Sequence, residues 1–243
     1  MRPLTTAELL QVWEKGLNQT MLDKTLGLLA MACSANDPRD IGHLSIGERD
    51  ARLLQLREWT FGQRLQNVTT CPQCNESVEW ESDLKDLYLQ PILPGLSVKT
   101  FVLEKDPFHI RYRLPDSFDM LKAVSNKEEH KKILANCLLE IHCQDEICTT
   151  DDLYEEIWVL LNDRMAQEDP QANIRINLSC PSCSYKWDAL FDIVSFFWAE
   201  INNWAKRIMQ EVCLLARAFG WSEKDILSMG SYRRQLYIQM IGK

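Results

Sequence analysis

Residues 67–84, NVTTCPQCNESVEWESDL, are repeated in outline by residues 177–193, NLSCPSCSYKWDALFDI. Both stretches contain Cys-Pro-x-Cys. In both, the fourth residue after the second cysteine is apolar, Val78 or Trp187, and the ninth is an aspartate. Because the agreement extends beyond the cysteines, it indicates that one short structural unit occurs twice in the chain.

Two such turns can supply all the ligands of one metal ion. A Cys-x-x-Cys turn places two sulfurs on the same side of a tight loop, and two turns together offer the four thiolates of a closed, tetrahedral structural zinc site. The sequence therefore predicts one structural Zn²⁺ per chain. Its predicted ligands are Cys71, Cys74, Cys180 and Cys183.

The residues around the cysteines predict the shape of this site. The residue after the second cysteine of such a turn often has a positive φ, which glycine adopts most easily. Here it is Asn75 or Ser184, and asparagine tolerates that conformation better than serine. β-Branched and aromatic residues follow each turn and predict short strands. We therefore expect a zinc ribbon in two halves, between which positions 75–179 leave and return.

Three other interpretations of the cysteines are weaker. Four unligated cysteines in two similar turns would leave the doubled spacing unexplained. A catalytic zinc needs an open coordination position, which four thiolates do not leave. A thioredoxin-like redox motif lies in a βαβ context, and the sequence predicts none around either turn.

The composition limits the class of protein. The chain has 243 residues, of which 46% are hydrophobic, as is usual for a globular protein. Its net charge is −8. An acidic chain is a poor general binder of nucleic acid, because that affinity comes mostly from neutralising phosphates. The nine cysteines and the absence of an apolar leader predict a reducing, cytoplasmic location without a disulfide framework. No stretch has the length and apolarity of a membrane span.

We expect a mainly α protein with a small β zinc ribbon, an α+β fold in which helices flank the split ribbon. Thr5 and Ser45 are predicted to begin helices, since each is followed by Glu three residues later. The expected segments form one compact unit. They are an N-terminal helical segment (1–66), the first ribbon half with strands (67–105), a mainly helical insertion (106–172), the second ribbon half (173–195) and a C-terminal helical segment (196–243).

Periodicity places several elements of the insertion. Phe108, Ile110 and Tyr112 alternate with polar residues and predict a strand. Asp116 or Ser117 is predicted to begin the following helix, and further helices are expected at 127–142 and 151–167.

The C-terminal segment contains an apolar stripe at helical spacing, which indicates either core packing or an interface between copies of the chain. The stripe is Phe197, Ile201, Trp204, Ile208, Val212, Leu215 and Phe219.

The sequence offers no catalytic motif. It has no Gly-rich phosphate loop, no His-Glu-x-x-His and no Gly-x-Ser-x-Gly. His142, Cys143 and Cys148 match no metal-site spacing, and we interpret them as buried cysteines beside an incidental histidine. We therefore expect no enzymatic activity and no small-molecule substrate.

Four further stretches carry a resemblance to a known family. They are LSIGERDARLLQLREWTFG before the first Cys-Pro-x-Cys, RLPDSFDML, CPSCSYKWDALFDIVSFFWAEI, and ARAFGWSEKDILSMGSYRRQLYIQMI. In this order, over about 44–241, the chain resembles the baseplate and baseplate hub-assembly proteins of T-even-type contractile-tailed phages and of phage-like contractile injection systems. The resemblance implies a non-enzymatic structural or assembly role, with other baseplate and tail proteins as partners and self-association as a further option.

One alternative function remains open from the residues themselves. A zinc ribbon followed by a C-terminal helix-turn-helix-like region, with Arg233 and Arg234 as phosphate contacts, would be a nucleic-acid-binding protein. The acidic total charge and the small number of basic residues in that region argue against it.

Overall fold

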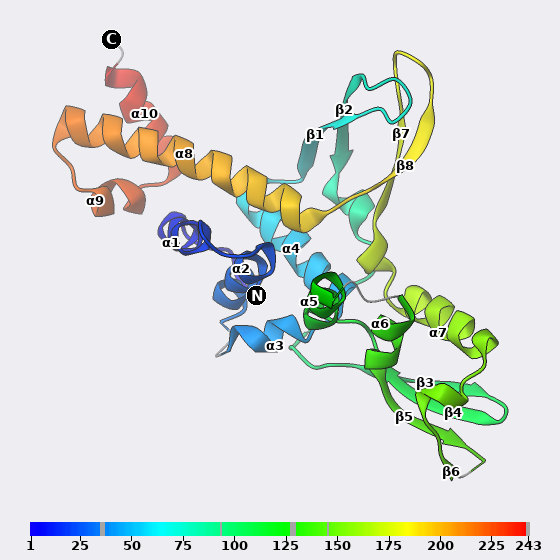
Figure 1. The fold of residues 1–243 in the computed structure, drawn as a ribbon. Helices are drawn as coiled ribbons and strands as arrows, with labels where there is room; N and C mark the ends of the chain where they lie inside the picture. The colour runs from blue at the N-terminus through cyan, green and yellow to red at the C-terminus, as the bar shows by residue number, and fades with distance from the viewer. Residues whose placement is uncertain (35–36, 93, 127–129, 145, 242–243) are drawn as a thin grey trace. The chain divides into compact units, whose positions relative to one another are not determined.

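The structure is a computed structural model that describes residues 1–34, 37–92, 94–126, 130–144 and 146–241. Its helices and strands are labelled in Figure 1. The chain divides into two compact units: unit 1 comprises Met1–Asn36 and Ile193–Lys243, and unit 2 comprises Asp37–Asp192. More of the described residues lie in helices than in strands, and the strand pairs among them are antiparallel. This confirms the α+β composition.

Unit 1 is built from helices at the two ends of the chain. Thr5 begins the first helix with a reciprocal capping box, in which its hydroxyl accepts from the Glu8 N–H and the Glu8 carboxylate accepts from the Thr5 N–H. The chain then turns before Thr20 begins the second helix. The helices are α1 (Thr6–Gly16), α2 (Met21–Cys33), α8 (Ile193–Phe219), α9 (Glu223–Ser228) and α10 (Ser231–Ile241).

The predicted stripe on α8 is largely a core surface. Leu10 of α1 packs against Ala205 and Ile208 of α8 in a buried cluster. The indole Nε1–H of Trp13 donates to Asn202 Oδ1 at 3.1 Å. Phe219, the last residue of the stripe, is 40% exposed, so core packing accounts for most of the stripe but not for its C-terminal end.

A close approach of α1 to α8 requires glycine at position 16. A Cβ atom at Gly16 would lie 2.4 Å from the Trp198 ring. Trp198 is buried, and the Lys24 ammonium lies 5.0 Å from its ring centroid on the α2 side. The ring therefore has little room to yield to a larger residue at position 16.

We predict that Gly16→Ala lowers the free energy of unfolding of unit 1 by about 1–3 kcal/mol, the usual cost of overpacking. Gly27 of α2 is the matched control, since a Cβ there would meet nothing within 4 Å. Gly27→Ala should raise the stability by up to about 1 kcal/mol through helix propensity. Denaturant unfolding of both variants measures the difference, and equal effects would contradict the contact.

Unit 2 begins with helices and carries three small sheets. Ser45 begins its longest helix by accepting from the Glu48 N–H, as predicted. The helices are α3 (Pro38–Gly42), α4 (Ile46–Phe61), α5 (Ser117–Asn126), α6 (His130–Cys137) and α7 (Glu155–Glu168). Three 3-10 turns, η1 (Leu84–Leu87), η2 (Thr150–Asp152) and η3 (Pro170–Asn173), connect other elements.

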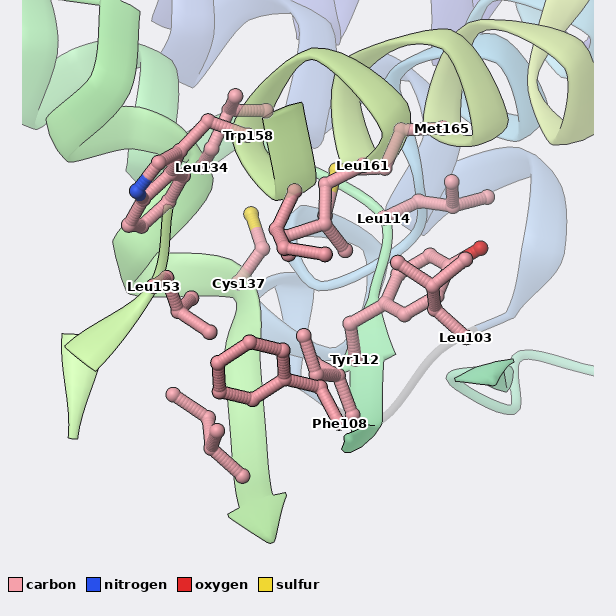
Figure 2. Close-up of a cluster of buried hydrophobic side chains, with 13 residues drawn as sticks. Leu103, Phe108, Tyr112, Leu114, Leu134, Cys137, Leu153, Trp158, Leu161 and Met165 are labelled. Carbon is pink, nitrogen blue, oxygen red and sulfur yellow. The ribbon is translucent and has the colours of Figure 1, made fainter. Parts of the chain in front are cut away.

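The insertion folds around its own sheet. The strand order is β3-β4-β5-β6, with β3 (Thr100–Lys105), β4 (Phe108–Arg113), β5 (Leu138–Cys143) and β6 (Glu146–Ile147). Figure 2 shows Trp158, Leu161 and Met165 of α7 among the side chains of this core, which include Phe108 and Tyr112 of the predicted strand. The alternation of residues 108–112 therefore predicted correctly which side chains are buried.

Two of the helices expected in the insertion differ from the structure. The helix expected at 127–142 ends at Cys137, and residues 138–143 form β5 instead; positions 127–129 lie outside the described residues. Pairing with β4, in which Ile141 lies opposite Ile110, overrides the local helical pattern. The helix expected at 151–167 begins only at Glu155, because the Thr149–Asp152 capping box closes the 3-10 turn η2.

Polar contacts join the start of α4 to the end of the insertion. The buried Asp169 carboxylate accepts from the Gly47 N–H at 2.9 Å. The fully buried Gln171 side chain accepts from the Leu89 N–H and donates to the Leu87 carbonyl. These bonds fix the base of the insertion, next to the points from which the two ribbon halves extend.

The division into two units cuts across the five expected segments. Residues 1–36 associate with the C-terminal helices rather than with the rest of segment 1–66. The boundaries of the five segments, and their packing as one unit, therefore stay a proposal. Across the described ranges, none of the helices combines the length and the apolarity that crossing a bilayer requires.

Candidate metal centre

Two hairpins of unit 2 carry the doubled sequence. β1 (Arg64–Thr70) pairs with β2 (Ser77–Asp83), and β7 (Arg175–Ser179) pairs with β8 (Lys186–Leu190). Each hairpin ends in one Cys-Pro-x-Cys turn, and Figure 1 shows the two hairpins side by side, although their strands belong to separate sheets. Strands therefore follow both turns, as predicted.

The two turns have the same backbone hydrogen bonds. In the first, the Cys71 N–H donates to the Glu76 carbonyl at 2.8 Å, and the Asn75 N–H donates to the Cys71 carbonyl at 2.9 Å. In the second, Cys180, Tyr185 and Ser184 repeat both bonds at the same distances. Asn75 and Ser184 have φ values of 60° and 61°, which confirms the positive φ predicted after each second cysteine.

The four sulfurs meet at the tips of the hairpins. Their Sγ atoms all lie within 4.8 Å of one another. Cys71 Sγ lies 3.7 Å from Cys183 Sγ, and Cys74 Sγ lies 3.6 Å from Cys180 Sγ. A tetrahedral zinc with Zn–S bonds of about 2.3 Å separates its sulfurs by about 3.8 Å. The arrangement therefore fits the size of a four-thiolate zinc site without a large rearrangement.

Each turn contributes one buried and one exposed cysteine. Cys71 and Cys180 are buried, while Cys74 and Cys183 are exposed. Val78 and Trp187, the equivalent apolar residues of the two copies, pack around the buried pair. The inner half of the cluster is thus shielded by a small apolar core, and the outer half faces solvent.

The pKa values show how unevenly the thiols would ionise without a cation. Backbone N–H groups of Cys183 and Ser182 stabilise the Cys180 thiolate and lower its pKa to about 7. The Glu76 N–H acts in the same direction on Cys74, but hydrogen bonds to the neighbouring sulfurs outweigh it and raise the pKa of Cys74 to about 12. Four neighbouring thiolates would repel one another. A divalent cation offsets this repulsion, because it favours the thiolate form at all four positions.

Among the residues that the structure describes, this is the only group of three or more His, Cys, Asp and Glu side chains that could hold a metal ion. His142 and Cys143 lie on β5, and Cys148 follows β6, so the helical character expected around them is absent. The pKa of Cys148 is raised by burial and by the neighbouring Cys143 thiol. Both cysteines are partly buried rather than buried.

The comparison with protein families decides the relationship of the chain. A family described as "T4 bacteriophage base plate protein" matches residues 2–198. The chain belongs to this family.

The match confirms the predicted resemblance and includes both Cys-Pro-x-Cys turns. It ends within α8, so the C-terminal stretch that contributed to the resemblance lies outside the matched residues. A search of curated proteins and a search of solved structures each found no match.

The structure does not support the nucleic-acid alternative for this baseplate family member. Arg234 is 2% exposed, and its guanidinium donates to Glu211 and to the Met229 carbonyl. A phosphate contact through this side chain would require breaking a buried ion pair. Of the two arginines on which that interpretation depended, Arg233 alone is exposed.

We predict that Ser184→Gly stabilises the metal-bound protein by about 1 kcal/mol, because glycine adopts the positive φ at this position without steric cost. Asn75→Gly should give a smaller gain, since asparagine already tolerates the conformation. Ser182→Gly is the control within the same turn and should give no gain, because Ser182 is not among the positive-φ residues. Thermal unfolding of the three variants measures the order.

Proposed function

We propose that the protein is a non-enzymatic structural or assembly protein of the baseplate region of a phage-like contractile tail or injection particle, and that a structural Zn²⁺ holds its fold together. The family match over residues 2–198 carries the first part of the proposal. The convergence of Cys71, Cys74, Cys180 and Cys183 within that matched region supports the second part.

The donor set favours zinc in a structural role. Four sulfur ligands select soft or borderline metals, and in a tetrahedral arrangement they are typical of zinc or iron–sulfur sites. With all four positions taken by protein, a bound zinc has no place for a water or a substrate. The metal then stabilises the fold by linking the two hairpins, and it supplies no chemistry of its own.

Other baseplate and tail proteins are the proposed partners. A baseplate is an assembly, so a member of a baseplate family acts through protein–protein contacts, inside the cell where the particle is built. A small-molecule substrate, nucleic acid and a membrane have no place in this proposal.

We predict one zinc per chain by elemental analysis of the purified protein. Replacing any one of the four predicted ligands by serine should remove most of the metal and destabilise unit 2 by several kcal/mol, because three ligands and a hydroxyl hold zinc far more weakly. Cys213→Ser is the matched control, since Cys213 is exposed on α8 in unit 1. It should keep full metal content. Full zinc in Cys71→Ser would contradict the assignment.

The baseplate role has its own test. Tagged protein expressed together with the tail genes of its own genome should co-purify with baseplate, tube or sheath proteins, identified by mass spectrometry. The metal-free Cys180→Ser variant should lose these partners, whereas Cys213→Ser should retain them. Recovery of no tail protein with the wild-type chain would reject the baseplate role and leave the zinc assignment standing.

A further inference from the structure

The last helix of unit 1 has apolar side chains on its exposed face. One face of α10 packs on the rest of unit 1: Arg234 pairs with Glu211 of α8, and Tyr237 contacts Phe219 and Trp221. The other face presents Tyr232, Leu236 and Met240, which are 77%, 38% and 62% exposed. These three residues are spaced by four and form one stripe, which we call the α10 stripe. A contiguous exposed apolar stripe of this kind is typical of a surface that a partner covers.

The charge next to the α10 stripe is positive. From Ile226 to the C-terminus the chain contains no Asp or Glu and carries Arg233, Arg234 and Lys243. Arg234 is neutralised by Glu211, but Arg233 is exposed, with its guanidinium 5.7 Å from the Tyr237 ring centroid. A surface that covers the α10 stripe therefore meets apolar side chains beside the exposed guanidinium of Arg233.

Unit 2 contains an apolar groove beside the edge of its four-stranded sheet. Its apolar lining is formed by Ala135, Leu138, Leu139, Ile141, Ile147 and Cys148. Ile147 is 85% exposed and Leu139 is 43% exposed. β6 pairs only with the end of β5, at His142 and Cys143, so the first half of β5 has no strand on its outer side within the described ranges. We call this surface the β5 groove.

The stretch of chain that forms the β5 groove is acidic in sequence. Between Lys132 and Arg164 the chain contains eight Asp and Glu and no Lys or Arg. The carboxylate of Glu140, which lines the groove, is paired with Arg111 of β4. The remaining acidic groups near the groove are the exposed Glu146 and Asp151 and the Thr149-bonded Asp152, which are near neighbours of the lining residues in the sequence. The same asymmetry holds for the whole units: unit 1 has ten Lys and Arg against seven Asp and Glu, and unit 2 has seventeen against twenty-eight.

From this complementarity we infer that the chain binds a second copy of itself head to tail, with the α10 stripe of one copy in the β5 groove of the next. Both halves of the contact lie on one chain: an apolar helix face beside the exposed Arg233 and an apolar groove beside the exposed Glu146 and Asp151, the helix-in-groove form of recognition. A symmetric contact between two α10 stripes would instead place two like charges, the Arg233 side chains, in one interface. A head-to-tail contact repeats and forms a ring or a chain of subunits.

The first test is sedimentation velocity of the full, zinc-loaded protein over a range of concentrations. Wild type should show species larger than a monomer, and raising the salt concentration should favour the monomer, because the opposite charges beside the two surfaces are screened. Leu236→Glu in the α10 stripe and Ile147→Glu in the β5 groove should each weaken association at least tenfold. The matched control is Val124→Glu, since Val124 is 77% exposed on α5 outside both surfaces; it should associate like wild type.

The second test distinguishes a head-to-tail contact from a symmetric one. Leu236→Glu keeps an intact β5 groove, and Ile147→Glu keeps an intact α10 stripe, so an equimolar mixture should form a dimer that neither variant forms alone. Circular dichroism and zinc content of each variant confirm that the folds are intact. A wild-type monomer at all concentrations, or a mixture that stays monomeric while wild type associates, would overturn the inference.

Discussion

The convergence of four cysteine sulfurs from two hairpins is the constraint on which the ribbon of this protein depends. Four thiolates within 4.8 Å of one another repel, and only a cation makes their joint ionisation favourable. Zinc binding in small zinc-folded peptides is worth about 10–16 kcal/mol, which equals the whole stability of many domains, about 5–15 kcal/mol. A zinc at this position would therefore be the strongest link between the two hairpins, whose described strands form separate sheets and also meet through the small apolar cluster of Val78 and Trp187.

The insertion is held by contacts that lie away from the four cysteines. Asp169 caps the start of α4 through the Gly47 N–H, and Gln171 bonds to the backbone on both sides of Tyr88. These buried bonds bring the start and the end of positions 75–179 together, so less loop entropy remains to be lost when the turns meet. The sheet of β3 to β6 with α7 adds a separate apolar core. The four cysteines and the polar bonds thus act on different parts of unit 2.

A baseplate protein works through its surfaces, and the two units offer surfaces of opposite charge. Unit 1 combines a basic end with the uncovered side of α10, and unit 2 combines an acidic stretch with the β5 groove. The family match covers residues 2–198 and stops before α9 and α10. The stripe on α10 therefore belongs to a part of the chain that the family description does not include, whereas the cysteine turns belong to the shared part.

The sequence by itself determined the features that depend on neighbours along the chain. The Cys-Pro-x-Cys turns, the caps at Thr5 and Ser45, the positive φ at Asn75 and Ser184, and the alternation in β4 are local, because turn and cap geometry is set within a few residues. Only the tertiary structure decided that residues 138–143 form a strand, that Arg234 is buried, and that one side of α10 stays uncovered. Each of these depends on a partner that is distant in the sequence, namely β4, Glu211 and the packing of α10 on α8. Local propensity cannot specify such contacts, because the free energy that selects them comes from burial and pairing between separate segments.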